Sequence, residues 1–238
     1  MTQKGYKEPL ALPRRFYKDV TVADGAVQLD GRTPRSPGAR PLVLPTEPLA
    51  QLVAEEWAAQ GEHIVMAQMP ATRLAWTALD RVAIAHEEVA AEVARYAASD
   101  ALCYVAEEPA ALVERQAHAW GPLLAWAREE LGVELHPVEG IIHRPQPPHS
   151  IARAGELAEA LNDFSLAALA HATALFGSAV LGFALQRGRV GGDEAFHLSR
   201  LDETFQEERW GIDAEAADRT QRLAQEAAML DRWFAALR

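Results

Sequence analysis

Short runs of alternating apolar and polar positions, separated by tight-turn residues, fill the N-terminal part of the chain from residue 14 to 45. The alternation runs through Val20–Leu29 and is interrupted by Asp24-Gly25. Asp-Gly favours the two-residue turn that joins twisted antiparallel strands, so this stretch predicts a β-hairpin. Similar runs predict two more strands, at residues 32–36 and 42–44, and hence a small β meander.

Over most of the remaining chain, apolar positions recur every three or four residues, which predicts helices. The first helix is expected between the N-cap Thr46 and Gly61, and its apolar stripe gives the meander a surface to pack on. From Pro70 onward almost everything is predicted to be helical. Further helix starts are predicted at Pro109, Ser150, Ser165, Asp193 and Asp213, and helix ends at Gly132, Gly177, Gly188 and Gly211.

These patterns predict an α+β protein with two domains. Residues 1–65 are expected to form a small N-terminal β-rich domain, a β meander with one helix, and residues 66–238 a larger all-α domain. A chain of 238 residues is long enough to bury a sizeable core. Its apolar runs all fall short of the roughly 20 residues that span a bilayer, so no membrane insertion is expected.

Charge is unevenly spread along the chain. Residues 1–45 carry eight Lys or Arg against four acids, a net charge of +4, whereas the whole chain carries −11, which leaves −15 for residues 46–238. An acidic body of this size repels nucleic acid phosphates, so no nucleic acid partner is expected. The basic N-terminal part could still attract phosphates, but we favour its complementing the acidic part within the chain or a partner protein.

Residues suited to catalysis or cofactor binding are not found in the usual arrangements. The glycines are scattered, unlike those of phosphate-binding loops. His86-Glu87-Glu88 resembles the start of a zinc-protease helix, but Ala90 stands where the second histidine would share the helix face. The single cysteine, Cys103, fits a reducing compartment and is expected to be a small buried residue. We therefore expect no catalytic residue, no metal, no cofactor and no small-molecule substrate.

The most distinctive stretch of the sequence is Ser199–Asp213. It holds five carboxylates, two arginines and two large aromatic residues, but no nucleophile and no pair of metal ligands. Such groups can hold the surface of another protein. We predict partner binding by Asp202, Glu203, Phe205, Gln206, Glu207 and Trp210. A second interpretation stays open, in which both aromatics belong to the core and the acids only solvate the helix.

A carboxylate pair offers the one enzymatic alternative. Glu203 and Glu207 stand four residues apart and share a helix face, an arrangement from which an acid–base pair can be built. The alternative is thus an enzyme that uses this pair in a cleft between the two domains. Glutamates at this spacing are more often a solvated face bridged by a neighbour such as Arg200, which favours partner binding.

A second group of charged residues lies on helices that are otherwise rich in alanine and leucine. Some of these side chains should face the interior or the seam between the domains, where charges have to be paired. A buried Arg–Asp network that fixes the two domains is the first interpretation, and a partner-binding groove is the second. The residues concerned are Arg73, Asp80, Arg81, Arg95 and Asp100.

A series of short motifs, taken in order, resembles a known family. It comprises Arg15-Phe-Tyr-Lys18, Leu29–Arg35, Leu44-Pro-Thr46, Glu55-Glu-Trp57, Gln60-Gly-Glu62, Met69–Leu74, Thr77–Val82, Arg95-Tyr96, Asp100–Tyr104, Asp202-Glu203, Gln206, Trp210-Gly and Asp213-Ala-Glu215. Together they resemble the ATP synthase assembly chaperones that handle the alpha subunit of the soluble catalytic head. Phe205 and Trp76 depart from the family pattern, which would have a larger aromatic and a smaller side chain at these two positions.

The resemblance implies a non-enzymatic chaperone with a β-rich N-terminal domain and a helical C-terminal domain. Its partner would be the unassembled alpha subunit, held until the beta subunit replaces it. Trp210 and Phe205 would be the anchors, and Asp202, Glu203 and Glu207 the groups that steer binding and release. The expected location is the bacterial cytoplasm, or the mitochondrial matrix of a eukaryote once a transit peptide has been removed.

Overall fold

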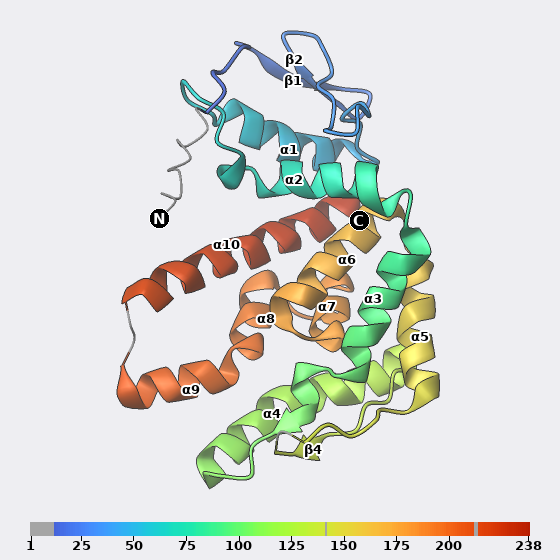
Figure 1. Cartoon of the computed structure of the whole chain (residues 1–238), viewed down its shortest axis with the longest axis vertical. Helices are drawn as coiled ribbons and strands as arrows, with labels where there is room; N and C mark the ends of the chain where they lie inside the picture. Colours follow the sequence, from blue (N-terminus) through green and yellow to red (C-terminus); the bar gives the residue numbers. More distant parts are fainter. Residues whose placement is uncertain (1–11, 141, 212–213) are drawn as a thin grey trace, which may run out of the picture.

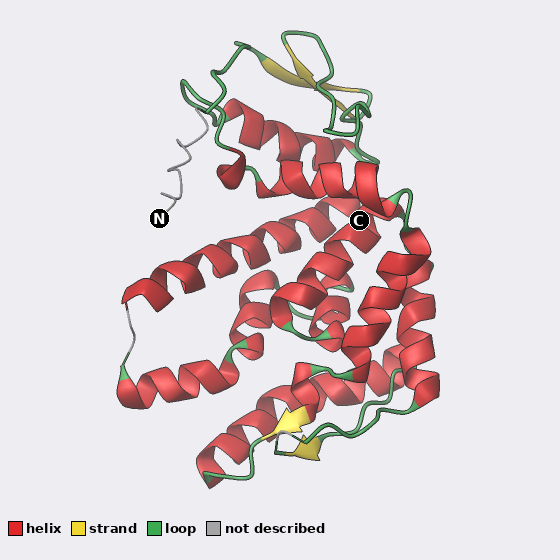
Figure 2. Cartoon of the chain, viewed as in Figure 1, coloured by secondary structure: helices red, strands yellow, loops and turns green. Residues whose placement is uncertain are grey.

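The computed structural model describes residues 12–140, 142–211 and 214–238, and it is mostly helical (Figures 1 and 2). Strands occur as an N-terminal hairpin and as one short parallel pair farther along the chain. The strands are β1 (Val20–Ala23), β2 (Ala26–Leu29), β3 (Tyr104–Val105) and β4 (Val138–Glu139). The α-helices are α1 (Glu47–Ala58), α2 (Pro70–Thr77), α3 (His86–Ala98), α4 (Ala110–Trp126), α5 (Pro148–Glu159), α6 (Asp163–Phe176), α7 (Ala179–Gln186), α8 (Gly192–Ser199), α9 (Leu201–Trp210) and α10 (Ala214–Leu237). Shorter helical turns are η1 (Met66–Gln68), η2 (Ala78–Val82), η3 (Ala101–Cys103) and η4 (Ala127–Leu131), of which η2 and η4 are π-helical.

The predicted hairpin is confirmed, and Asp24-Gly25 forms its turn with both residues at positive φ. The strands predicted at 32–36 and 42–44 are not regular strands. These segments make isolated bridges, such as Arg35 with Pro41, and the Val27 N–H donates to Leu42 O. Pro34 interrupts the first segment, and Pro41 and Pro45 flank the second, and each proline lacks the N–H that a ladder needs. The result is a meander in outline that packs on α1, as Figure 1 shows at the top of the molecule.

Helix α1 begins as predicted at Thr46, whose hydroxyl accepts a hydrogen bond from the Leu49 N–H, but three later N-cap predictions are wrong. Helices α5, α6 and α8 begin before Ser150, Ser165 and Asp193, after the caps Pro147, Asn162 and Gly191. Ser165 donates its N–H to the Asn162 side chain, so the asparagine does the work expected of the serine. Gly132, Gly177 and Gly211 end helices as predicted, Gly188 lies one residue beyond the cap Arg187 of α7, and Asp213 lies outside the described residues.

The core is continuous from the meander to the C-terminal helix. At its centre lies α7, whose residues Ala179–Leu185 are all buried, as expected of a helix that is apolar on every side. Helices α3 and α5 pack side by side, and α10 crosses the molecule against α1, α6 and α8 (Figure 1). The described helices include none that is both long and apolar enough to cross a membrane.

Several side-chain contacts cross the predicted domain boundary after residue 65. The Glu56 carboxylate accepts hydrogen bonds from the Ala71 and Thr72 N–H groups at 2.7 Å and so caps α2 from α1. Burial raises the pKa of Glu56 despite these bonds. The Thr46 hydroxyl also donates to Ala236 O at 2.6 Å, which ties the start of α1 to the end of α10. The two-domain division with its boundary at 65 stays a prediction, and the two parts are joined by specific contacts.

Candidate functional site

Helix α9 presents two different faces, and the predicted partner-binding residues are divided between them. Glu203, Gln206, Glu207 and Trp210 follow the spacing i, i+3, i+4, i+7, which places them along one side of a helix. All four line a hollow of about 1000 Å³ that is bounded by α8, α9, α10 and the end of α6. The structure therefore brings four of the six predicted residues together.

Asp202 and Phe205 lie on the face of α9 that turns toward α4. The Phe205 ring is buried, and the guanidinium of Arg209 lies over it, 4.2 Å from the ring centroid. Asp202 accepts a 2.7 Å hydrogen bond from the side-chain amide of Gln116, a buried residue of α4. Phe205 is thus a core residue, which agrees with the second interpretation left open for the two aromatics and not with an anchor on the surface.

A second link between α9 and α4 is a bidentate ion pair. Arg115 donates to both carboxylate oxygens of Glu208, at 2.8 and 3.0 Å. This hydrogen bonding by Arg115 lowers the pKa of the Glu208 carboxyl. Nothing in the local sequence of α9 indicates Arg115 or Gln116, because these partners lie some ninety residues earlier in the chain. Together the contacts fix the orientation of α9 and hence the direction of its other face.

Trp210 is the most exposed large hydrophobic residue of that other face. Its side chain is 79% accessible, whereas Trp120 and Trp233 are buried. The latter two donate their indole N–H groups to Leu198 O and Phe164 O. A tryptophan that stays accessible at the rim of a hollow is typical of interface anchors, since its large ring buries much area on binding.

Charged groups of both signs line the hollow beside Trp210. Glu207 forms an ion pair with Arg200 at 2.7 Å, and Arg200 also donates to the Thr220 hydroxyl of α10. Arg219 and Arg222 of α10 line the same hollow opposite Glu203. The face therefore carries charges of both signs, with one large apolar side chain at its edge.

The hollow beside α9 does not favour the alternative interpretation, an enzyme that uses the carboxylate pair. Glu203 and Glu207 do line one hollow, but its lining residues all lie between Ala101 and Leu223, so it is not a cleft between the two predicted domains. One member of the pair, Glu207, already has its carboxylate in the ion pair with Arg200. An acid–base pair needs both carboxylates available to a substrate, and the contact with Arg200 works against that.

The second predicted group does not form a buried Arg–Asp network among the described residues. Asp100 is fully buried and accepts hydrogen bonds from the Leu102 and Val180 N–H groups, while Arg95 is exposed. Burial raises the pKa of Asp100 to about 6. Backbone amides satisfy this carboxylate in place of arginines, which is why the expected pairing is absent.

Asp80 is the member of the group that does join the meander to the helices. Its carboxylate accepts hydrogen bonds from the Ser36 hydroxyl at 2.5 Å and from the Gly38 N–H at 2.7 Å. Gly38 has no room for a side chain, because a Cβ there would lie 2.5 Å from an Asp80 oxygen. Asp80 therefore lies at the predicted seam, although its partners are not arginines.

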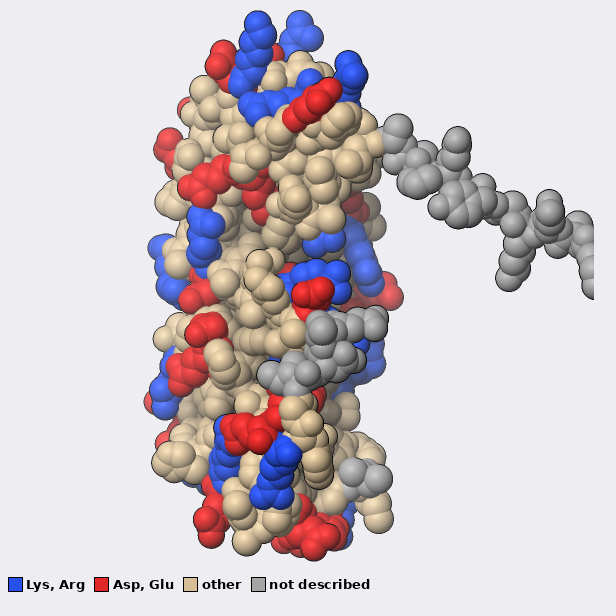
Figure 3. Space-filling view, turned by 90° about the vertical axis from the view of Figure 1, so that its left-hand side faces the viewer, with Lys and Arg blue, Asp and Glu red and all other residues tan. Residues whose placement is uncertain are grey.

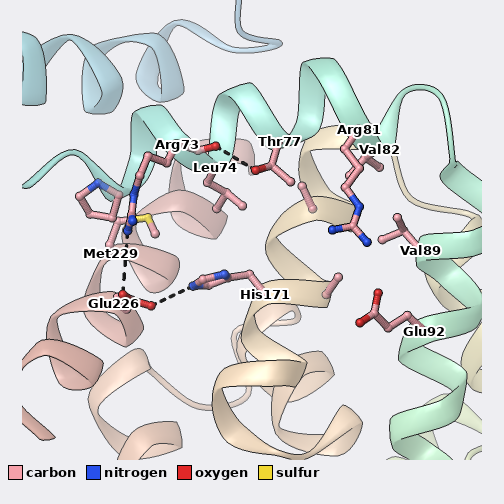
Figure 4. Close-up of a pocket in the computed structure, with 13 residues that line it drawn as sticks. Arg73, Leu74, Thr77, Arg81, Val82, Val89, Glu92, His171, Glu226 and Met229 are labelled. Atoms are coloured by element: carbon pink, nitrogen blue, oxygen red, sulfur yellow. Dashed lines mark hydrogen bonds and ion pairs between the residues drawn. The ribbon is translucent and has the colours of Figure 1, made fainter. Parts of the chain in front are cut away.

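Arg73 and Arg81 instead line a separate hollow of about 490 Å³ between α2, η2, α3, α6 and α10 (Figure 4). Arg73 reaches Glu226 at 4.0 Å, and Glu226 also contacts His171 at 3.1 Å. Arg81 and Glu92 point into the hollow from its other side, as Figure 4 shows. These two arginines fit the second interpretation of the group, a groove, better than the first.

The remaining candidates for chemistry are buried or scattered. Burial and the nearby charge of Asp100 raise the pKa of the Cys103 thiol to about 12, so it stays protonated at neutral pH. Over the described ranges, no three His, Cys, Asp or Glu side chains gather in a way that could hold a metal ion.

Comparison with known proteins identifies the family. The sequence pattern of the ATP12 chaperone protein family matches residues 14–128. The crystal structure of Atp12 from Paracoccus denitrificans is 41% identical and superposes with a TM-score of 0.87, over 95% of this chain and 99% of that one. The chain belongs to the ATP12 chaperone family. The fold class and the family resemblance seen in the sequence are thereby confirmed.

Other members of the ATP12 family and related structures agree with this assignment. The mitochondrial protein atp12 of Schizosaccharomyces pombe is 29% identical, over 85% of this chain and 76% of that protein. A crystal structure of a protein from Agrobacterium tumefaciens is 41% identical with a TM-score of 0.90, covering 95% of this chain and 87% of that one. ATP12 proteins are chaperones of ATP synthase assembly. The family pattern ends at residue 128, so it does not include α9.

Proposed function

We propose that this chain binds the unassembled alpha subunit of F-type ATP synthase and prevents its aggregation until it joins the beta subunit. The observation that carries the proposal is the exposed Trp210 indole on the charged face of α9, in a chain of the ATP12 family. The location follows that of the client, which is the bacterial cytoplasm or, in a eukaryote, the mitochondrial matrix.

The surface suits a client that has to be held and then released. A subunit outside its ring exposes a broad, partly apolar interface, and such surfaces aggregate. One aromatic anchor surrounded by charged groups gives enough affinity to cover part of that interface. Charged groups such as Glu203 remain partly solvated, so they favour rapid association and do not create a permanent interface.

The support beneath the surface also favours binding. Two side-chain links to α4, from Asp202 and Glu208, and the buried Phe205 hold α9 in place before a client arrives. A surface that is already ordered loses less conformational entropy on association. Asp202 and Phe205 thus act as positioning residues in this proposal, and Glu203, Gln206, Glu207 and Trp210 as contacts.

The experiment is a co-purification from the native cell, with the chain carrying Glu203→Lys. This substitution reverses an exposed charge in the hollow and breaks no contact in the described structure, so folding should be unchanged. We expect the recovery of unassembled alpha subunit to fall at least tenfold, and ATP synthase assembly to fall with it. The matched control is Glu130→Lys, the same charge reversal at an exposed position of η4 outside the hollow.

Two outcomes would refute the proposal. If wild-type protein never recovers free alpha subunit, the chain does not bind this client. If Glu203→Lys and Glu130→Lys both behave as wild type, the client binds elsewhere and the α9 face is not the site.

A further inference from the structure

A third hollow, of about 660 Å³, lies at the opposite end of the molecule from α9, between the meander and the helices α1 and α2. Its floor is aromatic and apolar, and its rim carries two arginines. The residues that line it are Phe16, Tyr17, Leu29, Asp30, Arg32, Thr33, Pro34, Arg35, Trp57 and Trp76. We call it the hairpin hollow.

Four aromatic rings form a continuous row through the hairpin hollow. Phe16 contacts Tyr17, Tyr17 contacts Trp57 and Trp57 contacts Trp76, with ring centroids 5.3, 5.8 and 6.4 Å apart and all three pairs edge to face. Phe16, at one end of the row, is 72% exposed. An exposed ring that continues a buried row offers a place where a further aromatic side chain can pack in the same geometry.

Two hydrogen-bond donors of this row have no acceptor. The indole N–H groups of Trp57 and Trp76 are both buried, and both lack a partner in the described structure. A buried donor without an acceptor costs about 1–3 kcal/mol, so two in one wall of a hollow call for an explanation. Both nitrogens are closed to solvent in the described structure, so an oxygen of a ligand in the hairpin hollow reaches them only when the Trp57 and Trp76 side chains turn toward it.

The charge around the hollow indicates which oxygen-bearing group fits. Arg32 and Arg35 are exposed on its rim, and residues 12–45, the described part of this end of the chain, carry six Lys or Arg against three acids, a net charge of +3. The one acid of the lining, Asp30, accepts hydrogen bonds from the Lys18 and Asp19 N–H groups, at 3.0 and 2.8 Å. Its carboxylate is thus turned to the backbone. Lys and Arg side chains are prominent at this end of the face in Figure 3.

From the open aromatic row, the two donors without acceptors and the basic rim, we infer that the hairpin hollow binds an acidic peptide segment that carries an aromatic residue. The aromatic side chain packs against Phe16, and the carboxylates face Arg32 and Arg35. Oxygens of the segment accept from the Trp57 and Trp76 indoles once these two side chains have turned toward it. This inference concerns a site separate from the α9 face and holds whichever protein supplies the segment.

A nucleic acid strand is the competing occupant, since bases stack on aromatic rings and phosphates attract arginines. The acidic remainder of the chain, at −15, repels a polyanion that extends beyond the hollow. A short peptide with a few carboxylates fits inside the basic end and avoids that repulsion. The peptide is therefore the favoured occupant, and the strand is an outcome of the test.

The test follows the indole N–H signals of the six tryptophans by ¹H–¹⁵N NMR during titration of the full chain with capped peptides. The probes are Asp-Glu-Phe-Glu-Asp, its alanine analogue Asp-Glu-Ala-Glu-Asp and the basic peptide Lys-Arg-Phe-Arg-Lys. With the first peptide we expect the Trp57 and Trp76 signals to move downfield, and those of Trp120, Trp233 and Trp210 to stay in place. The alanine and basic peptides should bind at least tenfold more weakly. Trp76→Phe, which keeps a ring and removes one N–H, assigns its signal.

The matched variants are Arg32→Glu and Arg40→Glu, which make the same charge change in the same basic region. Only Arg32 lines the hollow. We expect Arg32→Glu to weaken peptide binding at least tenfold and Arg40→Glu less than threefold. Circular dichroism shows whether each variant is folded.

Four results would overturn the inference. The first is that the acidic peptide moves no indole signal at millimolar concentration, and the second that it moves the Trp210 signal in place of the other two. The third is tighter binding of oligo(dT) than of the peptide, with steep salt dependence. The fourth is a shift of the two signals on concentrating the protein alone, which would make a second copy of the chain the occupant. None of these results bears on recovery of the alpha subunit through α9.

Discussion

Substituting the two aromatic residues of α9 one at a time should separate binding from folding. Trp210→Ala removes a side chain that is 79% accessible, whereas Phe205→Ala removes one that is buried. The two positions lie on the same helix, five residues apart, and neighbour the same set of acids. We expect the first substitution to weaken client binding without loss of stability, and the second to lower stability.

The sizes of both effects follow from burial. An aromatic side chain of this size buries up to about 250 Å², so the exposed part of Trp210 is about 200 Å². At about 25 cal/mol per Å², covering it completely is worth at most about 5 kcal/mol, and measured interface tryptophans contribute about 2–4 kcal/mol. Trp210→Ala should therefore weaken binding about 30-fold or more and change the free energy of unfolding by less than about 0.5 kcal/mol. Phe205→Ala should lower the free energy of unfolding by about 3 kcal/mol or more.

The assay measures the affinity of the purified chain for isolated alpha subunit by isothermal titration calorimetry, and the unfolding of each variant by urea denaturation. Light scattering of alpha subunit at 37 °C then shows whether aggregation is suppressed. If Trp210→Ala binds within threefold of wild type while remaining folded, Trp210 is not an anchor and the argument from its exposure is wrong. If it instead lowers stability by several kcal/mol, the indole has a structural role.

Three further predictions concern particular polar contacts. Among the described residues, His86 contacts two acceptors, Asp163 and Glu159 O, and the hydrogen bond to Asp163 raises the pKa of His86 above 6.5. The wild type should therefore be more stable than His86→Gln by up to about 1 kcal/mol below pH 6.5, and urea denaturation should show this advantage being lost as pH rises through the folded-state pKa. The Asp100 carboxyl carbon should titrate near pH 6 by NMR, and titration below pH 4.5 would contradict the effect of its burial. Because the pKa of Asp100 is raised in the folded state, this group should lower the free energy of unfolding by up to roughly 3 kcal/mol as pH rises from about 4 to 6. Asp80→Ala should lower the free energy of unfolding by about 1–3 kcal/mol and speed hydrogen exchange at the Gly38 amide, and unchanged exchange there would show that the carboxylate does not hold the meander.

Local sequence signals predicted those parts of the fold that local physics determines. Asp24-Gly25 gives the hairpin because its residues tolerate positive φ, and Thr46 gives the start of α1 because its hydroxyl reaches a free N–H. Alternation predicts strands at 32–36 and 42–44, but Pro34 within the first and Pro41 and Pro45 beside the second remove N–H groups that regular strands would need. Ser165 and Asn162, three residues apart, are both good N-cap residues by type, and sequence alone does not decide between them.

The candidate site was predictable in its residues but not in its orientation. Helical spacing places Glu203 and Trp210 on one face and Asp202 and Phe205 on another, yet either face could have been the buried one. What decides the matter is α4, whose Gln116 reaches Asp202. A contact between positions so far apart in the chain cannot be predicted from the sequence around either residue. The π-helical turn η2, which presents Asp80 to the meander, had no sequence signal that we can identify either.

Helix α9 illustrates how a polar helix can be held in one defined orientation. Its sequence is too polar to bury a broad stripe, and only Leu201 and Phe205 reach the core. A helix anchored by two apolar residues alone would fray and reorient, because isolated helices of this length are marginal in water. The contacts of Asp202 and Glu208 with α4 supply the missing orientation from polar groups. Glu203, Gln206 and Trp210 on the other face are then left exposed, and we expect substitutions there to leave the orientation of the helix unchanged.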